Sequence, residues 1–138
     1  MQDINIDDFY KDIAITLLSL YQQFPRKVSL YIEDLVGPDE VDEFGLHSQR
    51  YLSCIGAIMW LLDEGYIRYT QITHQENIED CTLTQKGFNK LIRVNLASKD
   101  NANSVEKQRS TLAHQLHIAV KEQSSISIRE LIESHLLN

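Results

Sequence analysis

The sequence predicts a mainly α-helical domain with one small β-hairpin, followed by a C-terminal helical extension. Two observations support this fold class. Over several long stretches, apolar residues recur every three or four positions, which is typical of helices that bury one face. Residues 66–84 instead contain two runs of β-branched and aromatic residues around a polar tip, which is typical of a hairpin. We expect one domain over residues 1–97 and a linker with further helices over residues 98–138.

The bulk composition favours a cytoplasmic protein without membrane contact. The chain of 138 residues is long enough for one domain with a sizeable core. Its longest apolar stretch, residues 54–62, is too short to span a bilayer, and the N-terminal residues are acidic where a signal peptide would be basic. The two cysteines, Cys54 and Cys81, form no C-x-x-C motif, which fits a reducing compartment.

The net charge of −7 is concentrated in the first third of the chain. Residues 1–45 contain three basic and ten acidic residues, whereas the remainder is balanced. An acidic protein can still bind DNA, because only the docking face must be positive. Whether this chain can bind DNA therefore depends on the local charge of the surface that would contact it, not on the net charge.

The first helix is predicted over residues 6–24. Asn5 or Asp7 is expected to cap its N-terminus, because short polar side chains accept hydrogen bonds from free backbone amides. Pro25 should end it. Its buried face consists of apolar residues spaced by three or four positions: Phe9, Ile13, Leu17, Leu20 and Phe24.

Residues 26–29 could form a small strand, and a short second helix is predicted over residues 30–36. Ser29 is its expected N-cap, and Gly37 with Pro38 should stop it. The connection that follows, residues 37–47, contains four acidic residues and is longer than a tight turn.

The third helix is predicted over residues 48–64, and Gly65 should end it in the left-handed conformation. Trp60 and Leu61 point away from its predicted apolar side, so we expect a C-terminal helix or a second subunit to cover them. At about 100° per residue, that apolar side consists of Tyr51, Leu52, Ile55, Ile58, Met59 and Leu62.

The hairpin is predicted to pair residues 66–72 with residues 81–84 across a polar tip, residues 74–80. Thr84 should then cap a fourth helix over residues 85–96. Across the domain we expect a core of Phe9, Ile13, Leu17, Leu35, Leu52, Ile55, Met59, Leu62, Ile67 and Leu83.

After a linker over residues 98–104, the pattern predicts two amphipathic helices. The first carries Val105, Leu112, Leu116 and Ala119 on one face. The second begins with a capping box, Ser127 and Glu130, and ends at Leu136 and Leu137. Isolated helices of this length are marginal in water, so both must bury their apolar faces. We expect a homodimer, with packing inside one chain as the alternative, and an interaction surface that comprises Trp60, Leu61, Leu112 and Leu116.

Two motifs carry a resemblance to a known family. The stretch LLDEGYIRY, residues 61–69, resembles the turn from recognition helix to wing. The stretch LTQKGFNKL, residues 83–91, resembles the exit from the wing in MarR- and PadR-like regulators of the winged helix-turn-helix superfamily. Gly65 can adopt the left-handed conformation of the turn, and Thr84 can cap the helix that follows. Gly87 permits a close approach of two backbone segments. The resemblance covers residues 7–96 and implies a winged-helix fold in a dimeric DNA-binding regulator.

The first functional hypothesis is a transcriptional regulator that binds double-stranded DNA. The third helix would enter the major groove, where Gln49 and Arg50 are residue types that bind base edges and Ser53 can contact phosphate. Arg26 and Lys27 are further DNA-binding candidates.

The alternative is a winged helix that recognises another protein within a larger assembly. Arg50 is the only basic residue of the third helix, and residues 70–81 contain three acidic residues but no Lys or Arg. DNA affinity depends on cationic contacts to phosphate, so an acidic wing tip would be repelled. The fold supports both functions, and the sequence leaves both open.

Catalysis is not expected. His114 and His117 lie three residues apart and could share a metal, but no acid or cysteine completes a ligand set. The chain also lacks a glycine-rich phosphate loop and a Ser/His/Asp order. We therefore expect a non-enzyme without cofactor or metal.

Overall fold

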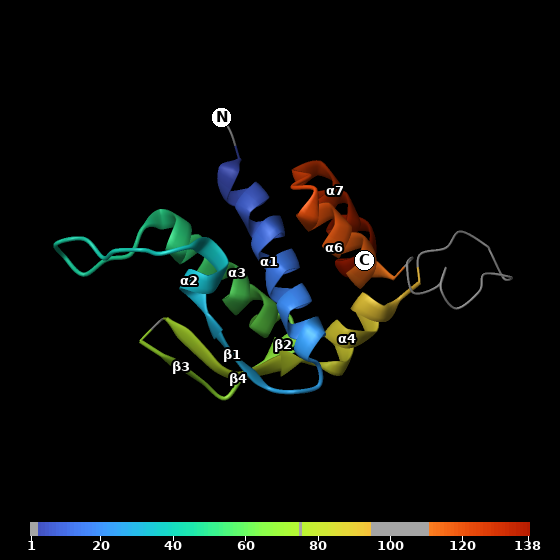
Figure 1. Cartoon of the computed structure of the whole chain (residues 1–138), viewed down its shortest axis with the longest axis horizontal. Coiled ribbons are helices and arrows are strands. Elements are labelled where there is room, and N and C mark those ends of the chain that lie inside the picture. Colours follow the sequence, from blue (N-terminus) through green and yellow to red (C-terminus); the bar gives the residue numbers. More distant parts are fainter. Residues whose placement is uncertain (1–2, 75, 95–110) are drawn as a thin grey trace, which may run out of the picture.

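The computed structural model describes residues 3–74, 76–94 and 111–138. The protein is mainly helical with a small four-stranded antiparallel sheet. In Figure 1, the first helix runs between the third helix on one side and the C-terminal helices on the other. The elements are α1 (Ile4–Gln23), β1 (Val28–Tyr31), α2 (Ile32–Val36), α3 (Gln49–Asp63), β2 (Ile67–Arg68), β3 (Gln71–Thr73), β4 (Asn77–Leu83), α4 (Gln85–Ile92), α6 (Leu112–Lys121), α7 (Ser125–Leu131) and a last π-helical turn, η1 (Ile132–Leu136).

α1 forms the centre of the core. Ile13, Leu17 and Leu20 are buried, and the helix packs against α3, α6 and α7. The helix begins at Ile4, after Asp3, whose side chain makes no capping hydrogen bond, so the predicted caps at Asn5 and Asp7 are wrong. No helix in the described part of the chain is both long and apolar enough to cross a membrane.

The small strand considered over residues 26–29 is present, but it covers Val28–Tyr31 and so includes the segment predicted as the beginning of the second helix. Leu30 pairs with Ile78 of β4, and Ser29 lies inside β1 rather than at a helix cap. α2 therefore begins at Ile32. The prediction failed because strand formation here depends on a partner far away in the sequence, which outweighs the weak local helix preference.

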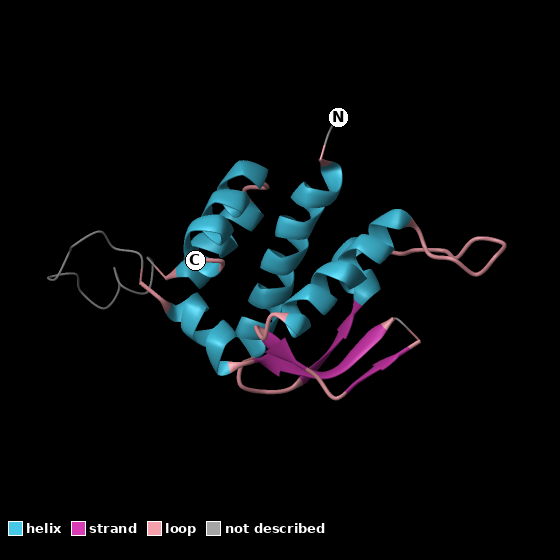
Figure 2. Cartoon of the chain, turned by 180° about the vertical axis from the view of Figure 1, so that it is seen from behind, coloured by secondary structure: helices cyan, strands magenta, loops and turns pink. Residues whose placement is uncertain are grey.

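The predicted hairpin is confirmed, with a longer return strand. Ile67 pairs with Leu83 and Ile72 with Ile78, and β4 begins at Asn77 instead of Cys81. β4 is central, with β1 on one side and β2 and β3 on the other. Figure 2 shows this sheet beneath the helices.

The predicted junction between hairpin and α4 is also confirmed. Gly65 has a φ of 80°. The Thr84 hydroxyl accepts a hydrogen bond from Gly87 N at 3.1 Å and donates one to Gly65 O at 2.5 Å. A Cβ atom on Gly87 would lie 2.2 Å from the backbone oxygen of Tyr66, so only glycine permits this approach. α4 ends at Ile92, before the predicted end; Leu96, the linker over residues 98–104 and Val105 lie outside the described residues.

The C-terminal helices pack on the rest of the same chain. α6 contacts α1 and α4, and α7 contacts α1 and α6. Leu112 and Leu116 are fully buried within the chain, as the alternative of packing inside one chain requires, so they are not available to a second subunit. α7 is capped by Ser124, not by the predicted capping box at Ser127 and Glu130. A homodimer stays a prediction, and it would have to use other residues.

The rotational orientation of α3 differs from the prediction. Its fully buried side faces α1 and contains Leu61, which was predicted to point outward, whereas Leu52 is 42% exposed. Trp60 is half-buried against Phe9 and Tyr66, with ring centroids 5.0 and 5.8 Å away. α3 has apolar residues around most of its circumference, so periodicity alone permits two orientations. The predicted core residues Ile13, Leu17, Ile67 and Leu83 are buried, and Phe9, Leu35, Ile55, Met59 and Leu62 are half-buried.

Candidate functional site

The predicted DNA-binding arginine forms an ion pair with a buried carboxylate of the same chain. Arg50 Nη1 donates to Asp12 Oδ2 at 2.7 Å, and Nη2 donates to Asp12 Oδ1 at 2.6 Å. Asp12 is only 1% exposed, and an oxygen of Asp8 lies 3.9 Å from Arg50 Nε. The hydrogen bond with Asp12 raises the pKa of Arg50, although burial acts in the opposite direction. The guanidinium group expected to bind base edges is therefore held by a carboxylate of the same chain.

Asp12 was missed because it lies in an otherwise apolar part of α1. The signal was present in the sequence: an acidic residue beside Ile13 and Ala14, on a helix that must be buried. A buried carboxylate requires a cation or several hydrogen-bond donors. Arg50 fulfils this need from a position 38 residues away.

The N-terminus of α3 is occupied by an acidic side chain. Ser48 donates to Asp39 through its backbone nitrogen at 3.2 Å and through its hydroxyl at 2.5 Å. His47 Nδ1 lies 2.9 Å from the same carboxylate, and its ring stacks on Tyr51 at 3.7 Å. Hydrogen bonds, above all that from the Ser48 side chain, lower the pKa of Asp39, while desolvation opposes them. A carboxylate thus lies at the positive end of α3, where a phosphate would otherwise be attracted.

The connection between α2 and α3 is an ordered, projecting loop, as Figure 2 shows. Asp42 Oδ1 accepts hydrogen bonds from the backbone nitrogens of Phe44 and Leu46 at 2.8 and 2.9 Å, and Gly45 has a φ of 79°. Phe44 is 78% exposed on this turn. The loop therefore presents apolar side chains among acidic ones.

The exposed stripe of α3 carries no cation. It consists of Gln49, Leu52, Gly56 and Asp63, while Ser53 is half-buried. Arg26 and Lys27 are exposed in the turn after α1. At a rise of about 1.5 Å per residue, the end of this helix lies roughly 16 Å from Asp12 along the helix axis. The structure therefore does not bring these two basic residues together with Arg50.

Two pockets lie around α2 and the hairpin. One, of about 320 Å³, is lined by the aliphatic side chains of Ile32, Ile55, Met59, Ile72 and Ile78. The other, of about 400 Å³, is lined by Tyr31, Glu33, Asp34 and Glu76. Ile32 of the first pocket donates its backbone N–H to the backbone oxygen of Glu76 of the second pocket, so the linings of the two pockets are in contact.

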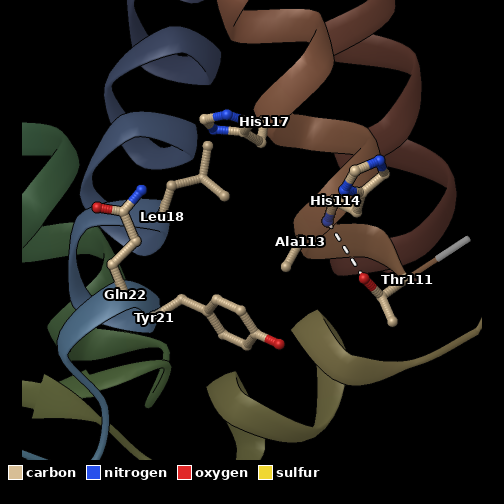
Figure 3. Close-up of a pocket in the computed structure, with 7 residues that line it drawn as sticks. All are labelled: Leu18, Tyr21, Gln22, Thr111, Ala113, His114 and His117. Atoms are coloured by element: carbon tan, nitrogen blue, oxygen red, sulfur yellow. Dashed lines mark hydrogen bonds between the residues drawn. The ribbon is translucent and has the colours of Figure 1, made fainter. Parts of the chain in front are cut away.

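The two histidines considered as metal ligands lie at a third pocket, of about 350 Å³, between α1 and α6. Figure 3 shows His114 and His117 on α6 near Leu18, Tyr21 and Gln22 of α1. Among the described residues, no group of three or more His, Cys, Asp or Glu side chains is arranged to hold a metal ion.

The cysteines have no nucleophilic character. Cys54 and Cys81 are unpaired and buried, and burial raises the pKa of each thiol to about 12. Both thiols are therefore protonated at neutral pH, and the thiolate is the reactive form.

The chain was compared with family models, curated proteins and solved structures, and none of the three comparisons gave a significant match. The resemblance to winged-helix regulators therefore depends on the two sequence motifs and on the order of the elements.

Proposed function

We propose that this chain is a winged helix-turn-helix domain that recognises another protein and does not read DNA through α3. The observation that carries this proposal is the bidentate ion pair between Arg50 and the buried Asp12. It leaves α3 without an available cation. The two free, buried cysteines fit a reducing compartment, so we place the protein in the cytoplasm.

The element order supports the winged-helix assignment. α1, β1, α2 and α3 are followed by a hairpin and α4, and β1 pairs with the return strand of that hairpin. The Gly65 turn and the Thr84 cap occur where the two motifs require them. In this assignment α3 corresponds to the recognition helix, and β3 with β4 to the wing.

The surface chemistry supports a protein partner over DNA. Recognition helices use several polar or basic side chains on base edges, and cationic contacts to phosphate supply much of the affinity. α3 instead exposes Leu52 and Asp63, and the wing carries Glu76 and Glu79. Asp39 adds a negative charge at the beginning of α3.

Binding of duplex DNA tests the first half of the proposal. Fluorescence anisotropy of a labelled random-sequence duplex should show no binding at roughly 100 µM protein in low salt, where a DNA-binding domain would bind even nonspecifically. Salt-dependent binding that Gln49→Ala weakens would overturn the proposal. Gln49 is exposed, so this variant retains the fold.

Site-specific photo-crosslinking in cells tests the second half. A photo-crosslinking amino acid is placed at Leu52 on α3, at Phe44 on the loop, or at Ile126 on α7 as a control that is about as exposed as Phe44. We expect a discrete protein adduct from Leu52 or Phe44 and none from Ile126. If all three positions give the same diffuse products, this surface recognises no specific protein.

A further inference from the structure

The apolar pocket lies between α3 and the inner face of the hairpin. Ile32 and Ile78 are buried and line its interior, whereas Ile55, Met59 and Ile72 are only half-buried. A volume of about 320 Å³ is large enough for an aliphatic side chain. An apolar opening of this kind on an exposed helix is typical of a docking site for another molecule.

A backbone hydrogen bond joins the linings of the apolar and the acidic pocket. Ile32 of the apolar pocket donates its backbone N–H to the backbone oxygen of Glu76, which lines the acidic pocket. Burial raises the pKa of Tyr51 in the first turn of α3, and the charges of Glu76 and Glu33 raise it further. Ile55 and Met59 follow Tyr51 at intervals of one helical turn.

Within residues 3–74, 76–94 and 111–138, the carboxylates of the acidic pocket have no paired cation. No ion pair in the described part of the chain involves Glu33, Asp34 or Glu76, and residues 28–49 contain no Lys or Arg. Tyr31, which is 49% exposed, adds an aromatic ring at the same pocket. Carboxylates beside an aromatic ring form a favourable environment for a Lys or Arg side chain.

We propose that the groove formed by these two pockets binds a basic segment of a partner protein. An aliphatic side chain of the segment enters the pocket beside Met59, and a Lys or Arg of the same segment lies against Asp34 and Glu76. This inference depends on the proposed function and specifies the partner's chemistry. A second copy of this chain is a poor occupant, because its projecting Phe44 loop is acidic and would bring like charges together.

Methyl NMR of the full-length protein tests the groove directly. The chain has two methionines, Met1 and Met59, so the Met59 methyl is a reporter inside the pocket, together with the lining isoleucines. The probe is a synthetic amphipathic helical peptide of leucine and lysine, and the control is the same pattern with glutamate in place of lysine. We expect saturable shifts of the Met59 and Ile55 methyls with the lysine peptide alone. Equal responses to both peptides, or shifts confined to other regions, would overturn the inference.

Charge reversal at the groove separates specific docking from general attraction. Asp34→Lys combined with Glu76→Lys changes two exposed side chains and should weaken binding of the lysine peptide about tenfold or more. Glu122→Lys combined with Glu130→Lys changes the overall charge equally on the C-terminal helices, and should leave binding nearly unchanged. If both pairs weaken binding equally, the groove is not the site. Photo-crosslinks from Phe44 would then still support a protein partner, whereas duplex binding would overturn the proposed function itself.

Discussion

Arg50 of α3 and Asp12 of α1 form a bidentate ion pair, with both hydrogen bonds shorter than 2.8 Å, that joins the helix expected to bind a ligand to the centre of the core. A residue type that suggests DNA recognition therefore stabilises the fold. A functional cation must be exposed to its ligand, whereas Arg50 faces a carboxylate that is almost completely excluded from water.

We predict that Arg50→Ala destabilises the protein, because it leaves the Asp12 carboxylate buried without a cation. The loss should be about 3 kcal/mol, the lower end of the range for buried pairs, since Arg50 itself is 32% exposed. Urea denaturation measures it, with the neighbouring exposed Gln49→Ala as control, expected within about 0.5 kcal/mol of wild type. If the unfolding free-energy changes of Arg50→Ala and Asp12→Ala simply add in the double mutant, the two side chains do not interact energetically and the prediction is contradicted.

Two glycines should respond in opposite directions to the same substitution. Gly87→Ala places a Cβ 2.2 Å from the Tyr66 backbone oxygen, so α4 must move, at a cost of roughly 1–3 kcal/mol. Gly56→Ala adds a Cβ to an exposed position within α3 where no atom lies within 4 Å, and should stabilise by about 0.5–1 kcal/mol. Thermal unfolding of the two variants measures both effects. Stabilisation by Gly87→Ala would mean that hairpin and α4 are not packed as described.

The orientation of α3 can be tested with paired leucine truncations. Leu61 is fully buried, so Leu61→Ala should lower the free energy of unfolding by about 2–5 kcal/mol. Leu52→Ala removes a side chain that is 42% exposed and should cost clearly less, about 1 kcal/mol. Chemical denaturation measures both variants, and a larger loss for Leu52→Ala would restore the orientation predicted from periodicity.

The Asp39 contact should make stability depend on acid pH. Its pKa is lowered in the folded protein, mainly by the Ser48 hydroxyl, so the folded state binds this proton less readily than the unfolded chain. The stabilisation is complete above the ordinary value of 3.8 and is lost as pH falls through the lowered pKa. Wild type should therefore exceed Asp39→Asn in stability near neutral pH, and the two should converge in acid. Urea midpoints across this range measure the difference, with Glu40→Gln as a control that should show no such convergence.

Features that depend on neighbouring residues were predictable from the sequence alone. Pro25 ends α1, Gly65 turns the chain, and Thr84 caps α4, because each acts on the backbone within a few residues of itself. The hairpin was predictable for the same reason, since its strands are joined by a short turn. Residue types at these positions restrict the local dihedral angles and hydrogen bonds whatever the rest of the fold does.

Features that depend on distant residues were decided by the tertiary structure. The Leu30–Ile78 strand pair, the orientation of α3 and the partner of Arg50 each require a contact between residues far apart in the chain. Periodicity shows that a helix has an apolar face, but a helix apolar on two sides needs its neighbours to choose between them. The charge of Arg50 was evident from the sequence, but whether this charge remained available to a ligand depended on the burial of Asp12.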